Sequence, residues 1–166
     1  MSSDFLNLLE RLVNAGVDFV IIGGFAGVVH GCTYVTQDID ICCDFNPANL
    51  LALQRAISDL HPVHRMTPKR KKLELTEQVC GQFKNLYLDT DIGQLDCLSF
   101  IDGIGDYSQA KRESELIEVE EEMKVRVLSL SALIKSKKSM NRPRDKEAVL
   151  QLEAIKKLKK PEQDLR

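Results

Sequence analysis

The spacing of hydrophobic residues predicts alternating helices and strands in the first sixty positions. Apolar residues recur every three or four positions over 5–13, which indicates an amphipathic helix that Gly16 ends. The β-branched run 17–22 predicts a buried strand, which stops at Gly23 and Gly24. The pattern then predicts a short apolar helix over 25–30, a strand over 38–43 and a helix over 46–60.

In the second half of the chain, strands precede helices. Residues 61–77 are basic and irregular, so we expect an exposed loop or edge segment there. The hydrophobic pattern predicts strands over 83–89, 94–100, 117–119 and 124–128, followed by helices over 129–141 and 144–159. This order predicts an α+β fold, in which helices flank a mixed β-sheet and a helical tail forms the C-terminal part.

Length and composition fit one globular domain. The 166 residues contain no repeat or low-complexity linker, so we expect a single domain over 1–166, with a core at about 17–128 and C-terminal helices at about 129–160. The chain is 43% hydrophobic and 29% charged, with a net charge of −2. Nothing in this balance indicates a nucleic-acid or membrane surface.

The five cysteines do not form a recognisable ligand or disulfide pattern. Their number is odd, no Cys-x-x-Cys occurs, and Cys42 and Cys43 are adjacent, so they point to opposite faces of a strand. We expect most of them to be small buried hydrophobes. With no leader segment and no long apolar run, we expect a cytoplasmic protein without membrane contact.

Three aspartates carry the candidate chemistry. Asp38 and Asp40 lie two apart in a predicted strand, so both carboxylates project from one face, about 7 Å apart at their backbones. Asp96 lies in a similar context, between two apolar residues, and a neighbouring strand would bring it to the same place. Carboxylate oxygens suit Mg²⁺ or Mn²⁺, and a cation between like charges relieves their repulsion. We therefore predict a divalent-metal site at Asp38, Asp40 and Asp96.

Gly23 and Gly24 form a second candidate element. They follow a predicted strand and precede a predicted helix, where glycine lets backbone N–H groups approach a phosphate. A Gly-Gly pair alone is most often only a tight turn. Thirteen residues separate Gly24 from Asp38, and together with the acidic pair the two glycines are a much more specific signal than they are alone.

This combination resembles the nucleotidyltransferase superfamily that shares the DNA polymerase β palm. The surrounding residues resemble its small prokaryotic branch, which is related to the abortive-infection toxin nucleotidyltransferases, and the resemblance spans about residues 17–155. The segments that carry it are Gly23-Gly24-Phe25-Ala26, His30-Gly31, Thr36-Gln37-Asp38-Ile39-Asp40, Gly93-Gln94-Leu95-Asp96, Leu133-Ile134-Lys135-Ser136-Lys137 and Arg142-Pro143-Arg144-Asp145.

The resemblance implies a polymerase β-like fold and an activity. In that superfamily three carboxylates bind two divalent metals, Mg²⁺ or Mn²⁺, and the Gly-Gly turn holds the triphosphate of a substrate such as ATP. A nucleoside monophosphate passes to a hydroxyl acceptor and pyrophosphate leaves. Carried over to this chain, Asp38 and Asp40 would ligate both metals. Asp96 would ligate the metal nearer the acceptor and assist deprotonation of its hydroxyl.

Three further residues are candidates for nucleotide binding. Thr36 either orients Asp38 or simply favours the strand. A triphosphate with two metals keeps some negative charge, so a converging cation is expected, and Lys137 or Arg142 could supply it. The alternative is that these residues form a solvated basic face or pair with Asp145.

Tyr34 departs from the pattern of the branch. It stands two residues before Thr36, where the branch often has an arginine that contacts phosphate or acceptor. A binding module that holds nucleotide and metal without transfer therefore stays open. The acceptor also stays open, because RNA such as tRNA, a protein or a small molecule would each fit. The resemblance allows a toxin component of a toxin–antitoxin pair, with an antitoxin-like partner.

Overall fold

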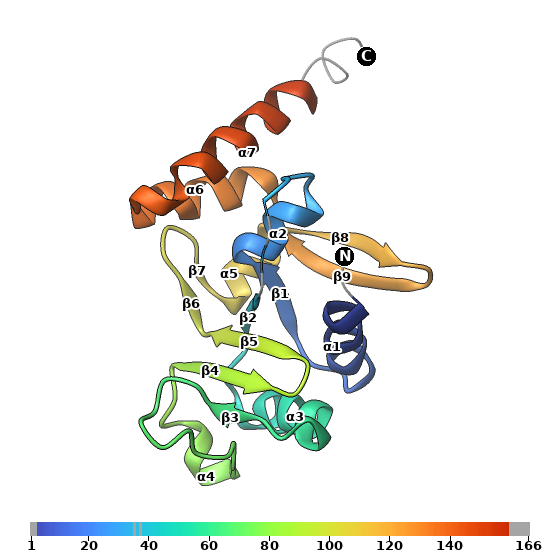
Figure 1. Ribbon diagram of the computed structural model, residues 1–166, viewed down its shortest axis with the longest axis vertical. Helices are drawn as coiled ribbons and strands as arrows, with labels where there is room; N and C mark the ends of the chain where they lie inside the picture. Colours follow the sequence, from blue (N-terminus) through green and yellow to red (C-terminus); the bar gives the residue numbers. More distant parts are fainter. Residues whose placement is uncertain (1–2, 35, 37, 160–166) are drawn as a thin grey trace.

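A seven-stranded mixed β-sheet forms the centre of the protein (Figure 1). The computed structural model describes residues 3–34, 36 and 38–159, so Gln37 and both ends of the predicted domain, including position 160, lie outside the described residues. The strand order is β3-β4-β5-β2-β1-β9-β8. These strands are β1 (Phe19–Ile22), β2 (Asp38–Cys43), β3 (Val63–His64), β4 (Asn85–Thr90), β5 (Gly93–Leu98), β8 (Ser114–Glu120) and β9 (Met123–Leu128).

The pairing explains how distant segments meet. β2 pairs antiparallel with β1 and parallel with β5, and β1 also pairs parallel with β9. The strands predicted over 83–89 and 94–100 form the hairpin β4–β5, and those predicted over 117–119 and 124–128 form the hairpin β8–β9. All four residues of β1 are buried, as expected for a central strand, and the β8–β9 hairpin projects from the body (Figure 1).

Helices surround this sheet, and the predicted α+β class with a C-terminal helical tail is confirmed. The last two helices lie side by side at one end of the molecule (Figure 1). No helix in the described part of the chain is long and apolar enough to cross a membrane. The helices are α1 (Ser3–Asn14), α2 (Gly23–Val29), α3 (Pro47–Ile57), α4 (Glu77–Cys80), α5 (Tyr107–Arg112), α6 (Leu130–Met140) and α7 (Lys146–Lys159).

The hydrophobic pattern missed three small elements: α4, α5 and the β6–β7 hairpin (Phe100–Ile101 and Gly105–Asp106). α5 has only six residues and one fully buried side chain, so it leaves almost no periodic signal. It is defined instead by a capping box, in which Asp106 accepts from the Gln109 backbone and Gln109 accepts from the Asp106 backbone.

The basic segment 61–77 is an edge of the sheet, as expected, but it is not wholly exposed. β3 pairs with β4 at the sheet edge, and Leu73 and Leu75 are buried. The Gln54 side chain accepts from the Leu75 N–H at 2.6 Å and donates to its carbonyl at 3.2 Å. The four consecutive cations at 69–72 are exposed. All five cysteines are buried and free, which confirms the expected role as small hydrophobes.

Asn49 holds the ends of β1 and β2 to α3. Its amide nitrogen donates to the carbonyls of Asp18 and Asp44, at 3.1 and 2.7 Å, and its oxygen accepts from the Asp18 N–H at 2.8 Å. We expect Asn49→Ala to lower the free energy of unfolding by about 1–2 kcal/mol, because it removes three part-buried hydrogen bonds to the backbone. Urea unfolding measures this. Asn7→Ala on the exposed face of α1 is the control and should change stability by less than about 0.5 kcal/mol.

Candidate active site

Adjacent parallel strands place the three aspartates together. Asp40 on β2 lies directly opposite Asp96 on β5, and Asp38 lies opposite Gln94. Along both strands the residues that alternate with the acids are buried, so the carboxylates share one face of the sheet. When its amide nitrogen faces Asp38, Gln94 donates to both carboxylate oxygens, at 2.5 and 3.2 Å. The structure therefore brings all three predicted acids to one place.

Gly23 adjoins this acidic face at the end of β1. It has a φ of +67°, and a Cβ atom there would overlap Oδ2 of Asp40. Glycine is therefore required both by the backbone and by the approach of the carboxylate. A Cβ on Gly24 would lie 3.3 Å from the hydroxyl of Thr36, which itself donates to the backbone carbonyl of Asp38 at 3.1 Å. Thr36 thus orients the backbone at the start of β2.

The acids perturb one another. Burial, followed by the charges of Asp96 and Asp38, raises the pKa of Asp40 from 3.8 to about 6. Burial and the Asp96 charge also raise the pKa of Asp38, against a smaller opposing effect of Arg65. No Lys, Arg or His side chain among the described residues forms an ion pair with Asp38 or Asp40. These two carboxylates therefore lack a direct counter-charge.

Arg65, which the sequence did not single out, binds the third acid. Its Nη1 and Nη2 atoms donate to Oδ1 and Oδ2 of Asp96 at 2.6 and 3.0 Å. Its guanidinium carbon lies 5.8 Å from the ring centroid of Tyr87, the residue opposite Asp96 on β4. Within the described ranges, no three His, Cys, Asp or Glu side chains are gathered closely enough to hold a metal ion. In this state the cationic partner of Asp96 is Arg65.

A cleft of about 350 Å³ opens beside the acids. Gly23, Gly24 and Asp40 line one side, and Lys137 and Arg142 from the C-terminal helical part line the other. The remaining wall is formed by residues of β1, β4, β5 and β6, by Asp102 and by residues of α6: Ile22, Asn85, Tyr87, Leu98, Phe100, Ile101, Asp102, Leu133, Ser136 and Met140. Five of the eight predicted site residues therefore share this cleft. Asp38 and Asp96 lie on the sheet beside it, and Thr36 lies behind Gly24.

Lys137 and Arg142 both pair with Asp145 while they line the cleft. Lys137 is only 6% exposed, and its Nζ lies 3.3 Å from Oδ1 of Asp145. Arg142 donates through Nε to Oδ2 at 2.5 Å. Burial alone would raise the pKa of Asp145, but the hydrogen bond from Arg142 and the charge of Lys137 outweigh it, so the pKa is lowered. Asp145 thus fixes two cations that face the acidic side of the cleft.

Tyr34 packs against α2, away from the acids. Its hydroxyl lies where a Cβ atom on Gly27 would be, and its ring is close to Gly24. The hydroxyl oxygen is buried without a hydrogen-bond partner in the described part of the chain. Burial, followed by the neighbouring Cys32, raises the pKa of Tyr34. Tyr34 therefore supports the Gly23–Gly24 turn from behind and does not line the cleft.

Comparison with known proteins identifies the fold. No protein-family model and no curated protein matches this sequence. Among solved structures, the lincosamide antibiotic adenylyltransferase LnuA with lincomycin bound matches with a TM-score of 0.63 and 15% identity, over 93% of this chain and 98% of that one. ANT(2")-Ia in complex with adenylyl-2"-tobramycin matches with a TM-score of 0.57 and 17% identity, over 93% and 91%. At these identities the likeness shows a shared nucleotidyltransferase fold, as the resemblance implied.

Proposed function

We propose that this protein is a divalent-metal-dependent nucleotidyltransferase, which moves a nucleoside monophosphate from a nucleoside triphosphate to a hydroxyl acceptor. The observation that carries this proposal is the placement of Asp40 directly opposite Asp96, beside Gly23 and across a cleft from Lys137. Acids on one side and cations on the other match a polyphosphate whose negative charge is partly neutralised by metal ions. The shared fold supports the same chemistry.

The donor atoms of the three acids suit a divalent cation, which would have to draw the carboxylates closer together than they lie here. Asp38 and Asp40 offer hard oxygen ligands. Their pKa values are raised by burial and by repulsion from neighbouring carboxylates, and a bound cation would relieve that repulsion. Asp96 would be the third ligand once Arg65 no longer holds both of its oxygens. When bound, Mg²⁺ or Mn²⁺ supplies charge neutralisation at the phosphate oxygens.

The triphosphate would lie in the cleft between the two sides. Gly23 and Gly24 begin α2, and the N-cap Ile22 makes no side-chain cap hydrogen bond within the described residues, so the N–H groups at this helix start would donate to a phosphate oxygen. Lys137 and Arg142 face them, and Asp145 holds both cations in place. In the proposed pose the triphosphate charge would face α6 and the α-phosphate would face Asp40.

The reaction follows from this placement. The acceptor hydroxyl oxygen attacks the α-phosphorus, the bond from that phosphorus to the bridging oxygen breaks, and pyrophosphate leaves. Asp96 lies on the side of Asp40 away from β1, so an acceptor hydroxyl approaching there would meet it first. Asp96 would then receive or orient the hydroxyl proton.

The acceptor is the open part of the proposal. One of the two similar structures is a lincosamide antibiotic adenylyltransferase, and the other contains an adenylylated tobramycin. ATP and a hydroxylated small molecule are therefore one candidate pair of substrates. RNA such as tRNA, and a protein hydroxyl, remain candidates, as does a role as toxin beside an antitoxin-like partner. Tyr34 stands where the family branch often has arginine. It lies behind the Gly-Gly turn and does not line the cleft, so it does not block a ligand there.

The proposal is tested by transfer of labelled phosphate. The protein is incubated with each α-labelled NTP, Mg²⁺ or Mn²⁺, and either a cell extract or a panel of hydroxylated small molecules. We expect a labelled product that requires the metal and both Asp38 and Asp40. Tight nucleotide binding without any such product would instead support a non-catalytic binding module.

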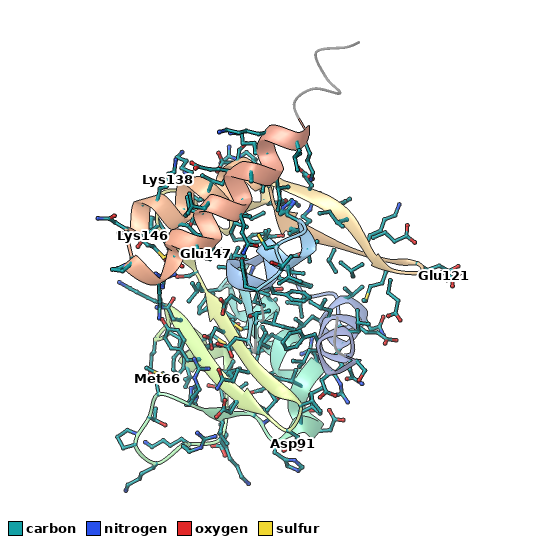
Figure 2. All side chains as sticks on the ribbon, turned by 45° about the horizontal axis from the view of Figure 1, so that its top comes forward. Met66, Asp91, Glu121, Lys138, Lys146 and Glu147 are labelled. Atoms are coloured by element: carbon teal, nitrogen blue, oxygen red, sulfur yellow. The ribbon has the colours of Figure 1, made fainter. Side chains whose placement is uncertain are left out.

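Two neighbouring lysines, Lys137 and Lys138, allow a matched test of where the triphosphate binds. Lys137 is buried in the cleft, whereas Lys138 is exposed on α6 (Figure 2) and pairs with Glu153. We expect Lys137→Gln to weaken NTP binding roughly tenfold, because it removes a charge-assisted hydrogen bond to phosphate. Calorimetric titration with a non-hydrolysable NTP measures this. Equal effects of Lys137→Gln and Lys138→Gln would contradict the placement of phosphate beside Lys137.

A further inference from the structure

Arg65 occupies the carboxylate that the proposed chemistry needs. It binds both oxygens of Asp96, and the exposed fractions of the two side chains are only 20% and 14%. A planar guanidinium that makes two parallel hydrogen bonds to a carboxylate forms the strongest type of ion pair in proteins. A cation that approaches Asp96 therefore meets a guanidinium charge already bound to both oxygens and competes with it for the carboxylate.

The acidic face is larger than the three predicted residues. β4 adds Asp89, which lies opposite Gln94, and its charge contributes to the raised pKa of Asp38. Two arginines from one turn, residues 65–70, offset this charge: Arg65 on Asp96 and Arg70 on Asp89, the second at 2.5 Å. Metal-free protein thus neutralises part of its own acidic face.

The turn is held in place by backbone hydrogen bonds that do not involve the Arg65 side chain. The His64 N–H donates to the Lys71 carbonyl at 2.7 Å, and Val63 forms a β-bridge with Lys72. Met66, next in the chain, is 70% exposed at the surface (Figure 2). The Arg65 side chain can therefore leave Asp96 while the backbone of the turn stays in place. Its Nη1 also donates to the Leu88 carbonyl at 3.4 Å, and its guanidinium carbon lies 5.8 Å from the centroid of the Tyr87 ring.

We propose that Arg65 is a positioning residue for Asp96 that competes with the divalent cation. In metal-free protein Arg65 orients the carboxylate and lowers repulsion on the acidic face. When a cation reaches the aspartates, it displaces the guanidinium toward Tyr87. The inference rests on the proposed function, because it requires that Asp96 meets a cation.

The proposal predicts opposite changes in two properties of one variant. Arg65→Gln should bind Mn²⁺ roughly tenfold more tightly than wild type, because the competing charge is gone. The same variant should unfold at a lower urea concentration in EDTA, because the acidic face has lost a counter-charge. Arg65→Lys keeps the positive charge but cannot make two parallel hydrogen bonds to the carboxylate. Its Mn²⁺ affinity should therefore fall between those of wild type and Arg65→Gln. A purely structural arginine would lower stability without tightening metal binding.

Mn²⁺ affinity is measured from the electron paramagnetic resonance signal of the free ion, at a temperature where every variant is folded by circular dichroism. Arg70→Gln removes the neighbouring pair on the same turn and is the control, with an expected change of less than about threefold. In an Asp96→Asn background, Arg65→Gln should have no effect on the affinity.

Three results separate this inference from the proposed function. If Asp40→Asn abolishes Mn²⁺ binding but Arg65→Gln leaves it unchanged or weaker, the competition is refuted and the metal site stands. The competition is also refuted if Arg65→Gln tightens binding equally in the Asp96→Asn background. If Asp40→Asn leaves Mn²⁺ binding unchanged, the metal site itself is refuted.

Discussion

Asp40→Asn is expected to reduce nucleotidyl transfer by at least about a thousandfold, because in the proposed function Asp40 is a ligand shared by the two cations. The substitution keeps the shape of the side chain and changes only its charge. Transfer of label from an α-labelled NTP in the presence of Mn²⁺ measures the loss. Activity above about one-tenth of wild type would contradict the role of Asp40 as a shared ligand.

The same variant should be more stable than wild type without metal. Each pKa unit corresponds to 1.36 kcal/mol, so a rise from 3.8 to about 6 means that ionised Asp40 costs the fold up to about 3 kcal/mol. The folded state binds the proton more tightly than the unfolded state. Wild-type stability in EDTA should therefore fall as the pH rises from about 4 to about 6, and stay low above that. Asp40→Asn should lose this part of the pH dependence.

Asp91 provides the matched control for this experiment. It lies in the β4–β5 turn (Figure 2) and pairs with His61, and both side chains are more than half exposed. Asp91→Asn should leave transfer within about twofold of wild type and change stability by less than about 0.5 kcal/mol. A stability gain in both variants would indicate a general effect of net charge, and not relief of repulsion at Asp40.

The acidic pair and its partner strand were predictable because both follow a local rule. Residues that lie two apart in a strand share a face, as Asp38 and Asp40 do. Asp96 has apolar neighbours on both sides, like Asp40, so an adjacent strand was expected to bring it to the same place. The main helices and strands were predictable for the same reason: in each of them the periodic pattern of hydrophobic residues is long enough to be recognised. The metal role assigned to the acids stays a prediction.

Arg65 was not predictable, because nothing local marks its partner. It lies 31 residues before Asp96, in a segment whose composition indicates only an exposed edge. The pairing depends on how β3 extends the sheet beyond β4, which is set by long-range packing. Lys137 was ambiguous for a related reason: a lysine on a helix usually faces solvent, and only the docking of α6 over the cleft buries it.

Gly23 and Gly16 offer a second test with a matched control. Both have a positive φ, +67° and +72°, so alanine at either position pays a backbone cost of about 1–2 kcal/mol. A Cβ atom at Gly16 meets nothing within 4 Å, whereas one at Gly23 meets the Asp40 carboxylate. We expect Gly23→Ala to be less stable than Gly16→Ala by at least about 1 kcal/mol, because Asp40 must move to make room.

The displacement of Asp40 should matter more for activity than for stability. A shift of about 1 Å in a metal ligand is expected to lower transfer roughly a hundredfold, whereas Gly16→Ala should lower it less than about twofold. Combining Gly23→Ala with Asp40→Ala separates the causes, because the overlapping oxygen is then absent and most of the extra instability should disappear. If the extra instability persists in the double variant, it arises from the backbone turn. The contact between Gly23 and the acidic face would then not explain why glycine is required there.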